Sequence, residues 1–146
     1  MKHVDVREAH QLQTSEGYAY VDVRSVAEFD CGHPAGASNI PLLHLDGRTG
    51  QMTPNQDFLK VFQANYPPDA KVLVGCQVGG RSAQAAQILE SVGYENVSNV
   101  RGGFRGTWHA MTGRVQDEGW TQAGLPVETE AQAGKSYEDL RGNVNG

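Results

Sequence analysis

A cysteine followed by glycines and an arginine is the part of this sequence best suited to chemistry. Cys76 lies in the stretch VLVGCQVGGRS, after the apolar run 72–74 and Gly75. A thiolate is a strong nucleophile, and the glycines permit a tight turn whose backbone N–H groups point at one anion. Arg81 adds a positive charge and Ser82 a hydroxyl donor. The spacing therefore predicts a nucleophilic Cys76 inside its own anion-binding loop, residues 76–82, called the Cys76 loop below.

Six residues after the cysteine are predicted to hold the anion. We expect their backbone N–H groups to line the pocket, and the side chains at 77 and 78 to face its entrance. These anion-binding residues are Gln77, Val78, Gly79, Gly80, Arg81 and Ser82. Two alternatives stay open: Cys76 is a small buried hydrophobe at a strand end, or Arg81 forms an ion pair with a neighbouring carboxylate.

A parallel sheet is needed to position these residues. Short, β-branched apolar runs predict buried strands, helical segments alternate with them, and Ser25 and Glu28 have the spacing of a capping box. The predicted strands are 3–4, 18–23, 36–40, 71–75 and 96–100, and the predicted helices are 6–13, 25–31, 55–65 and 81–92. This alternation predicts an α/β fold, with a parallel central sheet of about five strands and helices on both faces. Cys76 then falls at the carboxyl end of a strand, where such sheets bind ligands.

Length and charge limit the classes of function. The chain has 146 residues, and 12 basic against 17 acidic residues give a net charge of −5. We therefore expect one domain over residues 1–130, with no general affinity for nucleic acid or membranes. The polar residues 131–146 are expected to form a mobile tail. Because the N-terminus lacks the apolar centre of a secretory signal, we predict a cytoplasmic protein whose two cysteines form no structural disulfide.

Four motifs resemble those of the single-domain rhodanese sulfurtransferases of bacteria and plants. The Cys76 loop resembles the active-site loop of that family. DVRSVAEF at 22–29 resembles its DVR-x-x-x-E-F segment, and GHPAGASNIP at 32–41 resembles its GHI-x-GA-x-NIP segment. GGFRGTW at 102–108 is similar to its segment of paired glycines followed by a tryptophan. The resemblance extends over about residues 3–128 and implies a rhodanese-like fold.

The resemblance also implies the transfer of sulfane sulfur by a double displacement. Cys76 takes sulfur from a small anionic donor such as thiosulfate, or from a persulfide, and becomes a persulfide itself. It then passes the sulfur to cyanide or to a thiol, and a thioredoxin-like protein is a candidate acceptor. Neither a metal nor an organic cofactor is implied. The alternative is a rhodanese-like module that binds or relays sulfur without turnover.

The length of the Cys76 loop separates this function from that of a phosphatase. Four residues lie between Cys76 and Arg81, whereas the related dual-specificity phosphatases of the cell cycle and arsenate reductases have five. A shorter loop makes a smaller cradle, which suits a single sulfur better than a tetrahedral phosphate. Phosphatase or arsenate reductase activity is therefore the weaker enzyme hypothesis.

Other motif residues are predicted to support the site. Arg24 and Glu28 lie four residues apart on one helical turn and are expected to pair with each other. Asp22 is predicted to orient the Cys76 loop, either by accepting its N–H groups or by contacting an arginine. His33 is expected to fix a turn with hydrogen bonds rather than to act as a base.

The second cysteine is predicted to take no part in the chemistry. Cys31 is expected to end a helix away from the carboxyl edge of the sheet, and to be structural or incidental. The alternative is that its thiol resolves a persulfide on Cys76 into a disulfide.

An insertion interrupts the resemblance near residues 109–120. It is polar and contains glycine, and it is predicted to be a longer surface loop. The alternative is a lid or a docking surface for a protein. The residues to test in that case are His109, Arg114 and Trp120.

Overall fold

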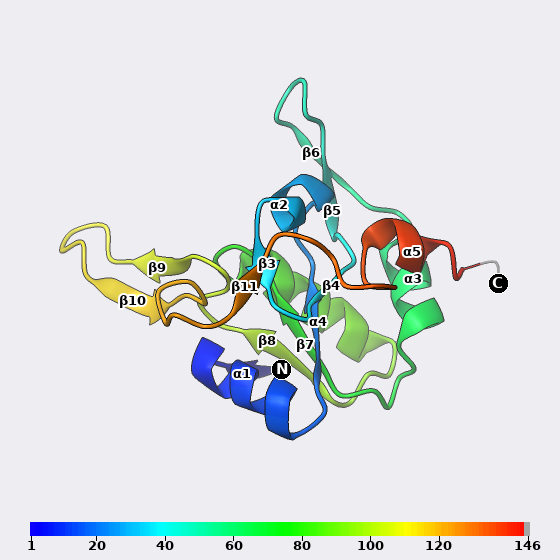
Figure 1. Ribbon diagram of the computed structural model, residues 1–146, viewed down its shortest axis with the longest axis horizontal. Coiled ribbons are helices and arrows are strands. Elements are labelled where there is room, and N and C mark those ends of the chain that lie inside the picture. The colour runs from blue at the N-terminus through cyan, green and yellow to red at the C-terminus, as the bar shows by residue number, and fades with distance from the viewer. Residues whose placement is uncertain (145–146) are drawn as a thin grey trace.

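The computed structural model describes residues 1–144 and has an α/β fold built on a five-stranded sheet (Figure 1). The strand order is β1-β8-β7-β2-β4, and all neighbouring strands are parallel. The strands are β1 (Lys2–Val4), β2 (Ala19–Asp22), β4 (Ser38–Asn39), β7 (Val72–Gly75) and β8 (Val97–Val100). The predicted fold class is confirmed, and each predicted strand contributes to this sheet.

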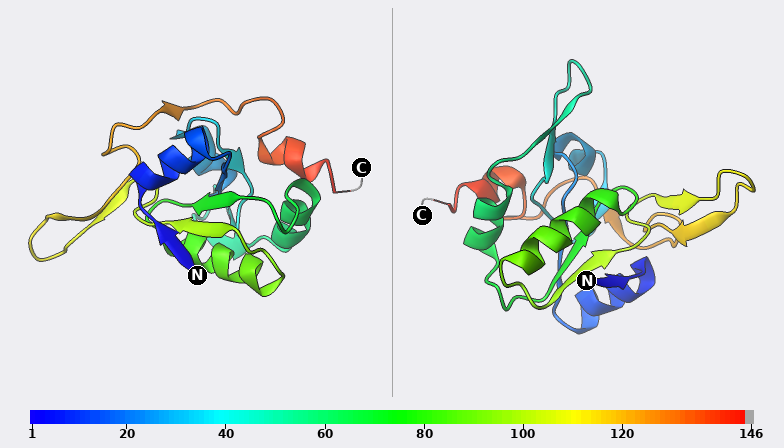
Figure 2. Two further views of the ribbon diagram at one scale, coloured as in Figure 1. Left: turned by 90° about the horizontal axis from the view of Figure 1, so that it is seen from below. Right: turned by 180° about the vertical axis from the view of Figure 1, so that it is seen from behind.

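Helices cover both faces of the sheet (Figure 2). They are α1 (Val6–Ser15), α2 (Val26–Asp30), α3 (Phe58–Asn65), α4 (Gly80–Ser91) and α5 (Tyr137–Arg141). On one face, α3, α4 and α5 form a core with Val72 and Val74, and on the other α1 and α2 form a core with Leu73. Successive residues of β7 therefore point to opposite faces and are all buried, as a parallel strand between two helical layers requires.

The connection from β7 to α4 creates the Cys76 loop. The buried strand ends at Gly75, and the helix begins at Gly80. Gly79 caps the helix with a φ of +112°, a backbone conformation that L side chains rarely adopt. The chain thus turns sharply at the carboxyl edge of the sheet, so that the first N–H groups of α4 face back toward Cys76.

The capping box predicted for α2 is confirmed. The Ser25 hydroxyl accepts a hydrogen bond from the Glu28 N–H at 3.3 Å, and the Glu28 carboxylate accepts one from the Ser25 N–H at 3.2 Å. These bonds satisfy donors that the first turn of a helix leaves free. They also hold Glu28 in the first turn of α2, from which its side chain extends to Arg81 in the Cys76 loop.

Three small antiparallel pairs lie outside the main sheet. They are β3 (His33–Pro34) with β11 (Val127–Glu128), β5 (Leu43–Leu45) with β6 (Met52–Pro54), and β9 (Gly106–Trp108) with β10 (Val115–Glu118). The β5–β6 and β9–β10 hairpins project away from the body of the molecule in Figure 1. Residues 109–114 of the predicted insertion form the turn of the β9–β10 hairpin, and residues 115–118 form its second strand.

Trp120 does not belong to the exposed part of that insertion. Its side chain is fully buried, its indole N–H donates to the Pro126 carbonyl at 2.7 Å, and its ring packs edge-on against Tyr20. The aromatic ring fills the core between α1 and the sheet, so Trp120 cannot serve as a surface contact.

The C-terminal segment also differs from the mobile tail that its polarity predicts. Tyr137 and Leu140, on α5, are buried in the core beside α3. The Asn55 amide donates to the Tyr137 hydroxyl at 3.1 Å, and the Asn65 amide donates to the Leu140 carbonyl at 3.0 Å. Two buried side chains three residues apart and these two hydrogen bonds hold the short helix against the body of the protein. Residues 145 and 146 of the predicted tail lie outside the described residues.

Candidate active site

The Cys76 thiol is buried and surrounded by hydrogen-bond donors. The N–H groups of Gly79 and Ser82 donate to its Sγ at 3.0 and 3.4 Å, and the Ser82 hydroxyl lies 3.3 Å from the same atom. The N-terminus of α4 adds the positive end of a helix dipole. All of these groups direct positive partial charge at the sulfur. The loop can therefore stabilise a thiolate, or an anion bonded to that sulfur.

Ser82 connects the sulfur to a polar residue on the neighbouring strand. Its hydroxyl lies within hydrogen-bond distance of Asn99 Oδ1, on β8, and Asn99 Nδ2 lies 3.0 Å from His3 Nδ1, on β1. Ser82 and Asn99 are buried, whereas His3 is exposed. A chain of polar contacts thus runs from the candidate nucleophile to the surface at the edge of the sheet.

Arg81 is paired with Glu28 rather than left free for an anion. Its guanidinium donates two hydrogen bonds to the Glu28 carboxylate, at 2.7 and 2.9 Å. Burial alone would raise the pKa of Glu28, but hydrogen bonds from Arg81 and Ser25 outweigh burial and lower that pKa to about 2. The same pair raises the pKa of Arg81. The positive charge predicted to bind a ligand is therefore largely used in joining α2 to the Cys76 loop.

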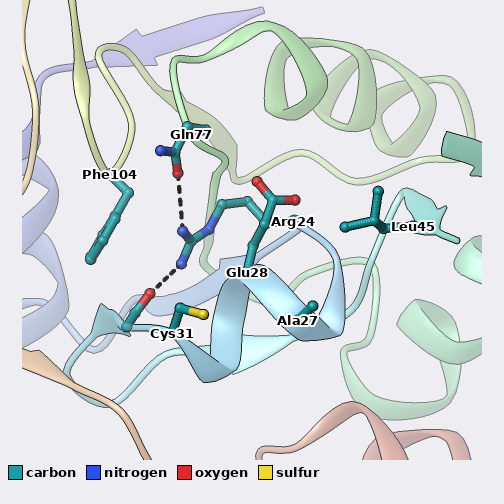
Figure 3. A pocket seen from close by; sticks show the side chains of 8 residues that line it. Arg24, Ala27, Glu28, Cys31, Leu45, Gln77 and Phe104 are labelled. Carbon is teal, nitrogen blue, oxygen red and sulfur yellow. Dashed lines mark hydrogen bonds between the residues drawn. The ribbon is translucent and has the colours of Figure 1, made fainter. Parts of the chain in front are cut away.

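Arg24 takes a different partner from the one that helical spacing predicts. Its guanidinium forms a buried ion pair with Asp22 at 2.7 Å, so the predicted Arg24–Glu28 pair is wrong. It also donates to Gln77 Oε1 at 3.1 Å and to the Gly32 carbonyl at 2.6 Å (Figure 3). Of the two roles considered for Asp22, the geometry is that of an arginine contact, through which it reaches Gln77.

The segment after β8 braces the Cys76 loop from the other side. The Phe104 N–H donates to the Cys76 carbonyl at 2.8 Å, and the Arg105 N–H donates to the Gln77 carbonyl at 2.9 Å. Gly103, with a φ of +60°, lies so close that an added Cβ would stand 2.8 Å from the Gln77 carbonyl carbon. The second of the paired glycines in the predicted family motif therefore allows two backbone segments to touch at the site.

A cavity of about 390 Å³ opens beside the Cys76 loop (Figure 3). Its lining joins α2, the start of β3, the β5 strand, the Cys76 loop and the segment after β8. The lining residues are Arg24, Ala27, Glu28, Cys31, Gly32, Leu45, Gln77 and Phe104. The Arg24 guanidinium stacks 4.5 Å from the centre of the Phe104 ring. Arg24 is paired with Asp22, and Arg81 is paired with Glu28. The cavity walls therefore present apolar side chains and ion pairs, rather than a free positive charge, to a ligand.

Cys31 lies on this cavity, which corrects the expectation that it sits away from the carboxyl edge. It is exposed and unpaired, and it shares the cavity with Gln77. The helix that it follows, α2, is only five residues long, so its end stays close to the strand edge. Val78, by contrast, is 46% exposed and points outward, where the entrance was predicted.

His33 has the surroundings of a structural residue. Its Nδ1 lies 2.7 Å from the Phe29 carbonyl, its Nε2 lies 3.3 Å from Glu128, and its ring stacks on Phe29. The ring is fully buried and ties the short β3–β11 pair to α2. These contacts agree with hydrogen bonds that fix a turn.

Sequence reasoning missed three residues that shape the site: Leu45, Asn99 and Phe104. Asn99 carries a readable signal, because a polar residue in the buried run VSNV, next to a strand end, needs a partner inside the protein. Phe104 directly follows the paired glycines, which mark a close approach of the backbone. Leu45 carries no such signal, since only the fold of the β5–β6 hairpin brings it to the cavity.

Within residues 1–144, no group of three or more His, Cys, Asp or Glu side chains has the arrangement needed to hold a metal ion.

Known proteins have sequences related to this one. Residues 5–110 match the rhodanese-like domain. The chain is 34% identical over 125 residues to thiosulfate sulfurtransferase 16, chloroplastic, of Arabidopsis thaliana, covering 86% of this chain and 91% of that protein. It is 32% identical over 125 residues to the senescence-associated protein DIN1 of Raphanus sativus, covering 86% of this chain but only 60% of that longer protein.

A solved structure shows the same architecture. The crystal structure of Rv0390 from M. tuberculosis matches with a TM-score of 0.70 and 27% sequence identity, covering 89% of this chain and 98% of that chain. The fold, the Cys76 loop and the matched residues 5–110 lead to one conclusion. This chain belongs to the rhodanese-like domain family, in which one relative is named a thiosulfate sulfurtransferase.

Proposed function

We propose that this protein is a sulfurtransferase that moves sulfane sulfur through a persulfide on Cys76. The observation that carries the proposal is the Cys76 Sγ itself, which faces the N–H groups of Gly79 and Ser82 and the Ser82 hydroxyl. A sulfur held this way is prepared for negative charge, both before it attacks and after it has accepted a second sulfur. The match to the rhodanese-like domain supports the same chemistry.

The reaction has two displacements. The Cys76 thiolate attacks the outer sulfur of thiosulfate, a new S–S bond forms, the S–S bond of thiosulfate breaks, and sulfite leaves with the electron pair. An acceptor, cyanide or a thiolate, then attacks the terminal sulfur of the Cys76 persulfide. The S–S bond on Cys76 breaks, and the cysteine returns as a thiolate. With cyanide the product is thiocyanate.

The loop residues are assigned supporting roles in this proposal. The N–H groups of Gly79 and Ser82 stabilise charge on the sulfur, while Gln77 and Val78 stand at the entrance. Arg81 acts chiefly by holding the loop against Glu28, because both of its hydrogen bonds end on that carboxylate.

The location of the protein stays a prediction. Within the described part of the chain, none of the helices is long and apolar enough to span a membrane. A relative is named chloroplastic. We propose the cytoplasm, as the sequence predicts, and fractionation of the source cells tests it.

The enzymatic proposal is tested with thiosulfate and cyanide. We expect the native protein to form thiocyanate, Cys76→Ser to form none, and the control Cys31→Ser to keep the native rate. Mass spectrometry after incubation with thiosulfate is expected to find about 32 Da of added sulfur on Cys76 and none on Cys31. Equal thiocyanate rates for the native and Cys76→Ser proteins would overturn the proposal.

Two other outcomes identify the alternatives. A persulfide that forms on Cys76 but reaches neither cyanide nor a thiol would indicate a binding or relay module without turnover. Hydrolysis of an aryl phosphate that Cys76→Ser abolishes would indicate a phosphatase.

A further inference from the structure

The β9–β10 hairpin carries exposed apolar side chains that belong to neither core of the protein. Trp108, Met111 and Val115 are 43%, 96% and 50% exposed. Trp108 and Val115 are opposite each other in the strand register, so their side chains lie on the same face of the hairpin. Exposed tryptophan on a projecting element is costly in water and is typical of residues that bind a partner.

The segment from the start of the hairpin through its turn, residues 105–115, is also basic, although the whole chain is acidic. Residues 105–115 contain Arg105, His109 and Arg114 and no carboxylate, whereas the chain has a net charge of −5. Across residues 1–144, no ion pair involves Arg105 or Arg114. The charges that remain free on the hairpin are therefore positive.

Both carboxylates at the base of the hairpin form ion pairs. Asp117 pairs with Arg101 at 3.1 Å, and Glu118 pairs with Arg7 on α1 at 2.7 Å. These pairs fasten the hairpin to the body of the protein and neutralise its acidic end. The unpaired Arg114 and the exposed apolar surface thus coincide at the outer end, which fits a partner with an acidic surface that surrounds an apolar patch.

The hairpin begins directly beside the candidate active site. It follows β8 at the carboxyl edge of the sheet, the edge at which Cys76 follows β7, and it extends outward from there (Figures 1 and 2). The Arg105 N–H, one residue before β9, donates to the Gln77 carbonyl at 2.9 Å. A protein seated on the hairpin would therefore lie next to the entrance of the Cys76 loop.

From this coincidence we infer that the β9–β10 hairpin docks a protein that accepts the sulfur, one with a cysteine thiolate near an acidic surface and an apolar patch. The inference rests on the proposed function. The acceptor thiolate attacks the terminal sulfur of the Cys76 persulfide, an S–S bond forms on the acceptor, the S–S bond on Cys76 breaks, and Cys76 leaves as a thiolate. Docking raises the local concentration of that thiolate at the loop, which a small thiol cannot achieve.

Reduced thioredoxin of negative net charge, a small dithiol protein, is the probe. Arg114→Glu and Trp108→Ser are each expected to raise the KM for thioredoxin about tenfold, because each removes one part of the contact. The rate with cyanide stays native, since cyanide needs no docking. Added salt is expected to shrink the native protein's advantage over Arg114→Glu and to leave the Trp108→Ser effect largely unchanged.

Matched controls lie on the other hairpin. Arg48→Glu and Met52→Ser change an exposed arginine and an exposed apolar residue at the β5–β6 hairpin, and both are expected to keep the native KM for thioredoxin. An unchanged KM in both β9–β10 variants would overturn the inference. So would an equal loss with cyanide, because that pattern reports damage to the site rather than loss of docking.

A binding measurement separates this inference from the proposed function. Calorimetric titration of the Cys76→Ser protein with thioredoxin requires no turnover. We expect binding that Arg114→Glu weakens, even if no thiocyanate forms in the activity assay. Absence of binding would overturn the docking inference, as would binding of an RNA oligonucleotide, but not of thioredoxin, that Arg114→Glu abolishes.

Discussion

The Ser82 hydroxyl has one hydrogen and three acceptors within reach. They are the Cys76 sulfur at 3.3 Å, the Gly79 carbonyl at 3.2 Å and the Asn99 side-chain oxygen. Because only one of them can receive that hydrogen fully, Asn99 competes with the candidate nucleophile for it. A residue on the neighbouring strand thus influences how strongly the loop stabilises a thiolate.

This competition predicts opposite effects for two changes at one position. Asn99→Asp provides a stronger acceptor and withdraws the hydrogen from the Cys76 sulfur, whereas Asn99→Leu removes the acceptor and leaves the hydrogen to the sulfur. The rate at which iodoacetamide alkylates Cys76 at pH 7, in a Cys31→Ser background, is the readout. Because a hydrogen bond to the sulfur stabilises its negative charge, we expect alkylation to be slower for Asn99→Asp and faster for Asn99→Leu, each by about threefold. Rates that change in the same direction would indicate only general disturbance of the site.

At the scale of elements, the contact between the segment after β8 and the Cys76 loop is a close approach of backbones. Gly103 is the residue that permits it, because a side chain there would meet the Cys76 carbonyl oxygen and the Gln77 carbonyl group. Gly113, in the hairpin turn, has a similar φ of +68° but open space around it. Both glycines have a positive φ that an L side chain rarely adopts, but only Gly103 touches the Cys76 loop.

This difference predicts unequal losses of sulfur transfer. Gly103→Ala and Gly113→Ala each put an L side chain in a left-handed conformation, at a cost of about 1–2 kcal/mol. Only Gly103→Ala also pushes the two segments apart, so we expect it to reduce the rate of thiocyanate formation at least tenfold, while Gly113→Ala keeps the native rate. Steady-state assays at a temperature where both variants are folded make the comparison. Equal rates in the two variants would show that the close approach has no role in activity.

The elements that the sequence predicts best are those whose signals are local. The capping box at Ser25 and Glu28 needs only a spacing of three residues, and the buried strand before Cys76 needs only a short apolar run. Partners distant in the chain are harder to predict. Arg24 and Glu28 have the spacing of a helical pair, but Arg24 lies before the helix and pairs with Asp22. Glu28 pairs instead with Arg81, which the fold brings from α4.

Short elements with few apolar residues were missed for a related reason. The strands of the β9–β10 hairpin have three and four residues, mostly polar, and their register is irregular between Val115 and Asp117. The helix α5 has only five residues, and its burial depends on α3 for a surface to cover. Such elements are stabilised by tertiary contacts, so local periodicity carries little information about them.

For the whole molecule, the Glu28–Arg81 pair connects pH to stability. The pKa of Glu28 is lowered from 4.5 to about 2 in the folded protein, where burial is outweighed by hydrogen bonds from Arg81 and Ser25. A group whose pKa is lower when folded stabilises the protein above its unfolded pKa. That stabilisation is complete at neutral pH and is lost as the pH falls from about 4.5 to about 2.

Glu28→Gln is therefore expected to lower the free energy of unfolding at pH 7 by about 1–2 kcal/mol. The difference in the free energy of unfolding between the native protein and Glu28→Gln becomes smaller as the pH falls from about 4.5 to about 2, because the native carboxylate becomes protonated and loses its charge. Urea unfolding at a series of pH values measures both quantities. Glu118→Gln, which breaks an exposed pair with Arg7, is the control and is expected to change little at any pH. A difference in the free energy of unfolding that stays constant from pH 7 to pH 3 would contradict this account.

The two tryptophans give the protein a pair of independent optical reporters. Trp120 is buried against Tyr20 and His10, so its fluorescence reports the integrity of the core. Trp108 is 43% exposed and lies beside Arg105, so its fluorescence reports on the hairpin. Replacing Trp108 with Phe leaves an emission signal that follows unfolding only. Subtracting that signal from the native spectrum isolates the hairpin, so that its encounter with another molecule can be followed in real time without a label.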